Sequence, residues 1–320
     1  MTTAFITGIT GQDGYYLAQR LISEGAAVHG LVQDMSEPGS DLLPAEVIKH
    51  VGDLTDPASI TAAITAAAPD EIYNLGGISS VAFSWEHPTL TSQVSGVGAV
   101  AVMEAARGLQ DSLGRPVRVL QASSAEIFGS ATIIPQHENT PISPVSPYGA
   151  AKAFAHLAAK VFREEGLPVS TVILYNHESP MRPPTFVTRK ITAGVAKIKH
   201  DGFGVITLGD LAPQRDWGWA PDYVDAMIKV IRHKEPSDFV IATGETHSVE
   251  ELVEQAFARV GITDWRAHVV QDTAFIRPVD TRLQVGDASK AREVLGWEPS
   301  LSFADIVNQM VDHDIALLAN

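Results

Sequence analysis

The chain has 320 residues, of which 45% are hydrophobic, which is enough for one large or two ordinary domains with a sizeable core. Its formal net charge of −15 argues against a generic nucleic-acid binder, because phosphate backbones attract basic protein surfaces. The lack of cysteine excludes disulfides and thiolate metal sites, and it favours a cytoplasmic protein.

Short β-rich runs alternate with alanine-rich helical stretches through the first 175 residues. Strands are predicted at 4–7, 28–32, 48–51, 72–75, 117–122 and 169–175, and helices at 15–23, 58–67, 98–108 and 149–165. Several of the strand runs are apolar almost throughout, as is typical of strands covered on both faces. The alternation predicts an α/β fold built on a doubly wound parallel sheet of the Rossmann type.

After about residue 175 this rhythm ends, and the chain continues with the polar, proline-rich stretch NHESPMRPPTF. We therefore expect a dinucleotide-binding domain over residues 1–175, completed by later strands near 205–208 and 238–242. Residues 176–320 are expected to form mainly a smaller substrate-binding region. It would pack against the strand ends, where doubly wound folds bind their ligands.

The first predicted strand leads into ITGITGQDG, which places Gly8, Gly11 and Gly14 at three-residue spacing where a helix should begin at Gly14. Glycine lets such a turn be tight, lets backbone approach a pyrophosphate, and lets the helix pack closely on the sheet. The spacing is GxxGxxG rather than the usual GxGxxG, and glycine-rich turns without ligands are common. The strand before it, the helix after it and the βαβ rhythm favour a dinucleotide-binding turn.

Two aspartates follow the next predicted strands. Asp34 lies twenty residues beyond Gly14, where a carboxylate can accept hydrogen bonds from the adenosine ribose hydroxyls, although a solvated loop residue is an alternative. No arginine or lysine stands near Asp34 to hold a 2′-phosphate, which favours NAD over NADP. Asp53 is expected either to reach the adenine or to cap the helix that begins near Asp56.

The segment SPYGAAK places Tyr148 and Lys152 one turn apart on one face of a helix that opens after Pro147. A tyrosine acts as an acid and base when its phenol pKa falls from about 10 towards 7, which a nearby ammonium and a positive nicotinamide ring favour. Upstream, LQASSAEIFG brings Ser124 and Glu126 to the end of the fifth predicted strand. The ordinary alternatives are a helix surface pair, a helix-capping serine and an exposed glutamate.

The chain resembles the extended short-chain dehydrogenase/reductase superfamily, and within it the GDP-mannose 4,6-dehydratase family, in the segments GxxGxxG, ASSAEIFG, SPYGAAK, YNHESP, FVTRKI and RDWGWAPDYV. The similarity extends from ITGITGQDG to GDASKAREVLGWEP. The most specific part is NHESP followed by FVTRKI and RDWG, which indicates a nucleotide-sugar dehydratase.

The resemblance implies oxidation of a nucleotide hexose at C4, loss of water across C5 and C6, and hydride return to C6 through a bound nicotinamide cofactor. It implies that Tyr148 is the base, with Lys152 as its partner, that Glu126 removes the C5 proton, and that Ser124 supplies a hydroxyl. The residues implied to line the cofactor include Gln12, Asp13, Leu54 and Leu75, and those implied to line the nucleotide sugar are Ser84, Asn176, Lys190, Arg215 and Arg277.

Two alternatives to a dehydratase stay open. A reductase or epimerase of the same superfamily would need Tyr148 and Lys152 but no C5 base, so Glu126 would be incidental. A non-catalytic NAD(P)-binding regulator would keep the glycine turn and would not need these three side chains. Their joint presence argues against the regulator.

The chain departs from the family in four places. The stretch LVQD replaces the basic residues that hold an NADP phosphate, and the loop at 35–43 is unlike the one that helps to build the family's tetramer. Met181 stands where arginine is usual, and Ala125 stands where serine is common. We therefore expect NAD rather than NADP. We also expect a homodimer formed through the alanine-rich helix GAAKAFAHLAAK.

The sequence predicts neither a membrane span nor a metal site. No apolar run approaches the roughly 20 residues that cross a bilayer. The N-terminus lacks the basic start and apolar core of a signal peptide. The eleven histidines include no HExxH or similar ligand spacing.

Overall fold

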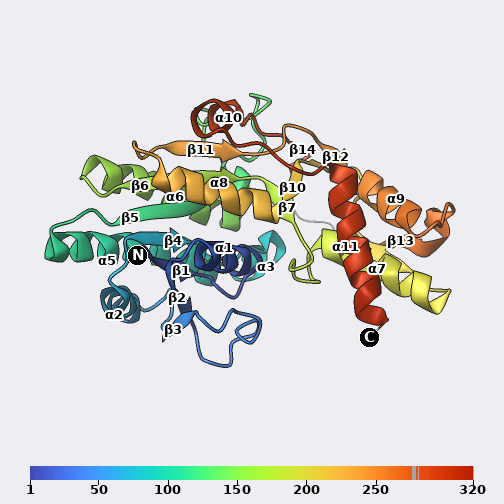
Figure 1. The fold of residues 1–320 in the computed structure, drawn as a ribbon. Coiled ribbons are helices and arrows are strands. Elements are labelled where there is room, and N and C mark those ends of the chain that lie inside the picture. Colours follow the sequence, from blue (N-terminus) through green and yellow to red (C-terminus); the bar gives the residue numbers. More distant parts are fainter. Residues whose placement is uncertain (276–278, 280, 320) are drawn as a thin grey trace.

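The computed structural model describes residues 1–275, 279 and 281–319. At its centre lies a seven-stranded sheet in which every neighbouring pair of strands is parallel (Figure 1). In spatial order the strands are β11 (Asp238–Ile241), β6 (Val169–Leu174), β5 (Arg118–Ser124), β4 (Glu71–Asn74), β1 (Thr3–Thr7), β2 (Ala27–Val32) and β3 (Ile48–Val51). The order reverses between β1 and β4, so the structure confirms the predicted doubly wound sheet.

Helices cover both faces of this sheet. One face carries α2 (Pro57–Ala67), α5 (Gly98–Leu113) and α6 (Pro147–Glu164), with α3 (Val81–Glu86), α4 (Pro88–Ser92) and the π-helical turn η1 (Gln93–Val97) alongside α6. The other face carries α1 (Gln12–Ser23), α8 (Ala220–Arg232) and α10 (Ser289–Leu295).

The side chains of successive strand residues point to opposite faces of the sheet and pack into two different hydrophobic cores. On β1, Phe5 packs into the core under α2 and α5, whereas Ile6 packs into the core under α1 and α8. The neighbours Val119 and Leu120 on β5 divide in the same way. The central strands are therefore covered on both faces, which is why they are apolar almost throughout, whereas the edge strand β3 leaves Ile48 and Val51 exposed.

A smaller lobe lies beyond the C-terminal ends of the main strands, at the opposite end of the molecule from the N-terminus (Figure 1). Its core is formed by α7 (Val187–Asp201), α9 (Val249–Arg259) and α11 (Phe303–Leu318). Short strands complete it: β7 (Asn176–Glu178) with β10 (Trp217–Trp219), β12 (His247–Ser248) with β9 (Gln214–Arg215) and β14 (Leu283–Gln284), and β8 (Ile206–Leu208) with β13 (Val269–Gln271). Single turns of 3₁₀-helix lie at η2 (Ala125–Ile127), η3 (Trp265–His268) and η4 (Thr273–Phe275).

Of the two later strands expected to complete the main sheet, one does so. Strand β11 pairs with β6, as the segment near 238–242 predicts. The prediction for 205–208 is wrong, because β8 pairs with β13 in a separate sheet. Ile206 and Leu208 are buried in the core of the small lobe, which holds this segment away from the edge of the main sheet.

Among the residues that the structure describes, no helix combines the length and the hydropathy that crossing a membrane requires.

Candidate active site

The turn between β1 and α1 brings three glycines into close contact. Gly8 has a φ of +68°, and a Cβ atom there would lie 2.8 Å from the backbone of Gly76. A Cβ atom at Gly14 would lie 2.4 Å from the carbonyl oxygen of Gly8. Helix α1 begins at Gln12 with Gly11 as its N-cap, so Gly14 lies inside the first turn rather than opening the helix. Only glycine permits this packing, which leaves bare backbone at a helix N-terminus where a pyrophosphate binds well.

The side chains of Gln12 and Asp13 tie this turn to β7 and the loop after it. The Gln12 side-chain amide donates to the carbonyl oxygen of His177 at 3.1 Å, and its oxygen accepts from the Ser179 hydroxyl at 2.8 Å. A carboxylate oxygen of Asp13 lies 2.8 Å from Nε2 of His177. These two predicted cofactor residues therefore join the glycine turn to His177 and Ser179 by hydrogen bonds.

The surroundings of His177 favour its protonated form. Its Nδ1 lies 2.7 Å from the carbonyl oxygen of Tyr175, and its Nε2 faces the Asp13 carboxylate. Both neighbours accept hydrogen bonds, which favours the imidazolium form with a hydrogen on each ring nitrogen. Burial works to lower the pKa of His177, but attraction to Asp13 and the hydrogen bonds with Asp13 and Tyr175 together outweigh it, and the pKa is raised. Burial likewise works to raise the pKa of Asp13, and His177 lowers it overall.

This ion pair predicts a pH-dependent contribution to stability. The raised pKa of His177 gives stabilisation that is complete below its ordinary value of 6.5 and is lost as pH rises through the folded-state pKa. The lowered pKa of Asp13 gives stabilisation that is complete above 3.8 and is lost as pH falls through its folded-state pKa. The pair therefore contributes most between pH 3.8 and 6.5.

In that window, His177→Gln is expected to lower the free energy of unfolding by about 3 kcal/mol, as for removal of one partner of a buried ion pair. The difference from the parent should shrink as the pH rises. Urea unfolding of both proteins across a pH series measures it. His200→Gln is the control, because His200 pairs with Asp201 at the surface, where ion pairs contribute little. A difference that does not change with pH would contradict the charged state of His177.

Helix α6 presents Tyr148 and Lys152 as the sequence predicts. Pro147 is its first residue, and the Ser146 hydroxyl caps it by accepting the N–H of Gly149 at 3.0 Å. A Cβ atom at Gly149 would lie 2.6 Å from the carbonyl oxygen of Glu126. Glycine at this position therefore lets η2, which carries Glu126, pack against the start of α6.

Burial dominates the acid–base behaviour of this pair. It raises the pKa of Tyr148 to about 12, against an opposing hydrogen bond with Ser124. Burial lowers the pKa of Lys152 to about 8, and attraction to Asp13 opposes this shift. The Lys152 ammonium donates to the carbonyl oxygen of Ala122 at 2.9 Å. In the protein alone the phenol is protonated at neutral pH, so a base at this position needs the added positive charge of a bound cofactor.

The end of β5 brings a hydroxyl and a carboxylate to the same place. The Ser124 oxygen accepts the backbone N–H of Glu126 at 3.2 Å and shares a hydrogen bond with Tyr148. An oxygen of the Glu126 carboxylate accepts from the side-chain amide of Gln284 at 3.0 Å. The neighbouring Ser123 hydroxyl is buried and has no hydrogen-bond partner among the described residues. A buried unpartnered hydroxyl beside these groups fits a site that a bound cofactor completes.

The residues predicted to line the nucleotide sugar are dispersed. Ser84 is buried next to Tyr148, whose backbone N–H it accepts at 3.2 Å. Asn176 begins β7, and Lys190 on α7 lies 4.0 Å from the ring centroid of Phe275. The last two are Arg215, which is buried on β9, and Arg277, which lies outside the described residues.

The acidic residues after β2 and β3 form local turns. One carboxylate oxygen of Asp34 accepts both the N–H and the hydroxyl of Ser36. Asp53 makes the same two bonds with Thr55. The helix after β3 is capped by Asp56, which accepts the N–H of Ala58, so Asp53 is not the cap. Asp34 and Asp53 therefore both accept hydrogen bonds from residues of their own loops.

Two apolar residues predicted to line the cofactor lie close to the glycine turn. Leu54 has a methyl group 2.8 Å from where a Cβ atom of Gly76 would stand, and Gly76 in turn packs on Gly8. Leu75 is partly buried against the core under α1. Their roles towards a cofactor stay predictions.

Sequence reasoning did not assign three side chains that the structure places at the site: His177, Gln284 and Glu37. His177 lies within the NHESP segment that carried the resemblance. The sequence therefore drew attention to this segment, but it did not indicate that His177 pairs with Asp13. Gln284 reaches Glu126 across 158 residues of chain. The carboxylate of Glu37 contacts the hydroxyl of Thr10 in the glycine turn.

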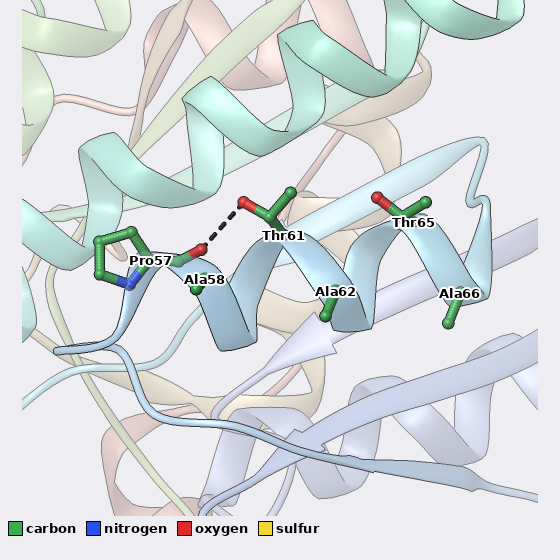
Figure 2. A pocket seen from close by; sticks show the side chains of 6 residues that line it. All are labelled: Pro57, Ala58, Thr61, Ala62, Thr65 and Ala66. Atoms are coloured by element: carbon green, nitrogen blue, oxygen red, sulfur yellow. Dashed lines mark hydrogen bonds between the residues drawn. The ribbon is translucent and has the colours of Figure 1, made fainter.

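A hollow on the surface lies elsewhere, along α2 (Figure 2). It is lined only by Pro57, Ala58, Thr61, Ala62, Thr65 and Ala66. The Thr61 hydroxyl in this hollow donates to the carbonyl oxygen of Pro57 (Figure 2). Without a titratable side chain, this face offers no acid–base chemistry. Within the described ranges, no group of three or more histidine or carboxylate side chains is placed to hold a metal ion.

Known proteins resemble the chain along almost its whole length. The family model for GDP-mannose 4,6 dehydratase matches residues 5–310. The sequence is 43% identical to GDP-mannose 4,6 dehydratase 1 of Arabidopsis thaliana over 98% of this chain and 90% of that protein. It is 41% identical to GDP-mannose 4,6 dehydratase of Homo sapiens over 98% of this chain and 92% of that protein. The solved structure of UDP-glucose 4-epimerase from Thermotoga maritima has the same fold, with a TM-score of 0.88 at 23% identity over 99% of both chains.

Proposed function

Because the chain belongs to the GDP-mannose 4,6-dehydratase family, we propose that it removes water from the hexose of GDP-mannose and forms GDP-4-keto-6-deoxymannose. The matches confirm the family resemblance, and the chain is a hydro-lyase that works with a bound nicotinamide cofactor. The observation that carries the substrate chemistry is the Glu126 carboxylate beside Ser124 and Tyr148. The proposal includes a cytoplasmic location, which the absence of cysteine supports.

The site residues take distinct roles in this proposal. When bound, the cofactor supplies an acceptor for hydride from C4 and a donor of hydride to C6. Tyr148 takes the proton of the C4 hydroxyl, and Lys152 favours the phenolate by its charge. The new C4 ketone acidifies the C5 hydrogen, which Glu126 removes as a proton. The C6 hydroxyl leaves as water with a proton from Glu126, Ser124 or both, and C5 regains a proton as hydride reaches C6.

We propose that the small lobe binds the nucleotide diphosphate through Lys190, Arg215 and Arg277, with Ser84 and Asn176 towards the sugar. A chain with a net charge of −15 can hold a diphosphate when a few cations are gathered locally. The position of this lobe at the carboxyl ends of the strands supports the assignment, because doubly wound folds bind ligands there.

The experiment that tests the activity incubates purified protein with a panel of nucleotide sugars and follows the products by mass spectrometry. Loss of one water from GDP-mannose is the expected result. A product of unchanged mass would favour an epimerase, and a product two hydrogens heavier, formed with added reduced cofactor, would favour a reductase. Cofactor binding without turnover of any sugar would favour the regulator.

We also propose that the chain forms a homodimer through α6. Of the alanines of this helix, Ala151, Ala155 and Ala159 do not form the contact surface, because they are buried within the chain itself. The outward face instead carries Phe154 and Val161, which are 51% and 59% exposed, with Leu157 between them. Exposed apolar side chains on Leu90 and Val97 continue this surface onto the adjoining α4 and η1. A second copy of the same face would cover it by two-fold symmetry.

Leu157→Glu is expected to convert the dimer to a monomer, because it places a charge in the centre of this apolar surface. Light scattering in dilute solution measures the mass. Leu317→Glu is the control, since Leu317 is also an exposed leucine but belongs to α11, which lies in the small lobe away from α6 (Figure 1). A tetrameric parent, or a Leu157→Glu variant that stays dimeric, would overturn this proposal.

A further inference from the structure

The loop after β2 folds back onto the glycine turn through Glu37. One oxygen of the Glu37 carboxylate accepts the Thr10 hydroxyl at 2.7 Å, and the other accepts the backbone N–H of Gln33 at 2.6 Å. The chain stays close two residues later, where a Cβ atom on Gly39 would lie 2.9 Å from the carbonyl oxygen of Thr10. The carboxylate is thus held between the turn that carries Gly11 and the first residue after β2.

In a dinucleotide-binding fold, the place that Glu37 occupies is next to the adenosine ribose of the cofactor. The adenosine ribose lies between the glycine turn and the end of the second strand, and an acidic side chain there accepts its hydroxyls. An NADP enzyme needs donors and positive charge at the same place, because its 2′ position carries a phosphate. In this chain the two available donors, the Thr10 hydroxyl and the Gln33 N–H, are already bonded to Glu37.

The surrounding cations do not offset this negative charge. The sequence contains no lysine or arginine from residue 21 to residue 48. Before this stretch in the sequence, the nearest basic residue is Arg20, which pairs with Glu24 and Asp225. After it, the nearest is Lys49, whose ammonium donates to the carbonyl and the hydroxyl of Ser40. The nearest basic side chains in sequence are therefore bonded elsewhere.

Asp34, the residue expected from its spacing, is less suited to the task. Its oxygen accepts the N–H and hydroxyl of Ser36 in a tight local turn, and the side chain is exposed. Glu37 is half-buried and contacts the glycine turn directly. A carboxylate has about four acceptor positions, so Glu37 keeps two for ribose hydroxyls after its bonds to Thr10 and Gln33.

We propose that Glu37 makes the chain specific for NAD, by accepting the ribose hydroxyls of NAD and by repelling the 2′-phosphate of NADP. The inference rests on the proposed function, because it requires the glycine turn to bind a nicotinamide dinucleotide.

The test measures dissociation constants by calorimetry for NAD and NADP on protein stripped of bound cofactor. The parent is expected to bind NAD at least about tenfold more tightly than NADP, a ratio that corresponds to about 1.4 kcal/mol. Glu37→Gln removes the charge and keeps the shape, so the ratio should fall to about threefold or less, chiefly by tighter NADP binding. Glu37→Ala is a second variant with the same expectation, and thermal unfolding establishes that both variants fold.

Asp34→Asn is the matched control, because it removes one carboxylate from the same loop. It should leave the ratio unchanged. A parent that prefers NADP, or a ratio unaltered by both Glu37 variants, would overturn the role of Glu37 while leaving the dehydratase proposal intact. A ratio that changes in Asp34→Asn alone would assign specificity to Asp34 instead. Failure of the parent to bind either dinucleotide would overturn the proposed function itself.

Discussion

Glu126→Gln is expected to lower the rate of dehydration by about 10²–10⁴-fold, the usual contribution of a positioned general base. The substitution keeps the size of the side chain and its contact with Gln284 but removes the basic oxygen. Oxidation at C4 precedes proton removal at C5, so the variant should still transfer hydride. Mixing it with GDP-mannose should therefore produce the absorbance of reduced nicotinamide without loss of water from the sugar.

This pattern separates a lost base from a damaged site. The binding of the cofactor, measured by calorimetry, should match that of the parent. Glu104→Gln is the control, because Glu104 is exposed on α5, a helix that packs on the far face of the sheet from α1. Undiminished dehydration by Glu126→Gln would remove Glu126 from the mechanism and would favour an epimerase or reductase.

Tyr148→Phe is expected to abolish both partial reactions, with a loss of about 10²–10⁴-fold or more in hydride transfer. The ring stays in its buried position, so packing is kept and only the hydroxyl is lost. Since the C4 proton then has no acceptor, neither reduced nicotinamide nor a dehydrated product should form. Stopped-flow absorbance and mass spectrometry measure the two steps on the same samples.

The matched control for this variant is Tyr15→Phe. The Tyr15 hydroxyl accepts only a surface hydrogen bond from Gln19, so its removal should leave both steps unchanged. If Tyr148→Phe still reduced the cofactor at the parental rate, the base for C4 oxidation would have to be another group.

The parts of the molecule that follow local rules were predictable from the sequence. The first six strands of the sheet were predictable because short runs rich in apolar side chains alternate with helical patterns, which is typical of a parallel sheet covered by helices. The i, i+4 spacing of Tyr148 and Lys152 is local, and so is the tight turn at Gly8. Each of these features depends on neighbours within a few residues, which a single sequence displays directly.

Contacts between distant segments were not predictable. The pairs Asp13–His177 and Gln284–Glu126 join residues that are 164 and 158 positions apart, and no periodicity relates them. The strand at 206–208 has only three residues, and its sequence does not place it in one sheet rather than another. The choice between Asp34 and Glu37 depends on how a loop folds back, which spacing from Gly14 does not encode.

Strand β11 belongs to the main sheet but comes late in the sequence, which affects how this sheet folds during synthesis. Strand β6 ends at Leu174, but its outer neighbour is not complete until Ile241, after α7, α8 and the first short strands of the small lobe have been made. During synthesis, one edge of β6 therefore stays unpaired, with its backbone N–H and carbonyl groups free. Such an edge can pair with a strand of another chain. A polypeptide that stops before residue 238 would keep this edge, together with the apolar surface that Phe239, Val240 and Ile241 otherwise cover. Premature termination in this stretch would thus yield an aggregating chain rather than an isolated nucleotide-binding domain.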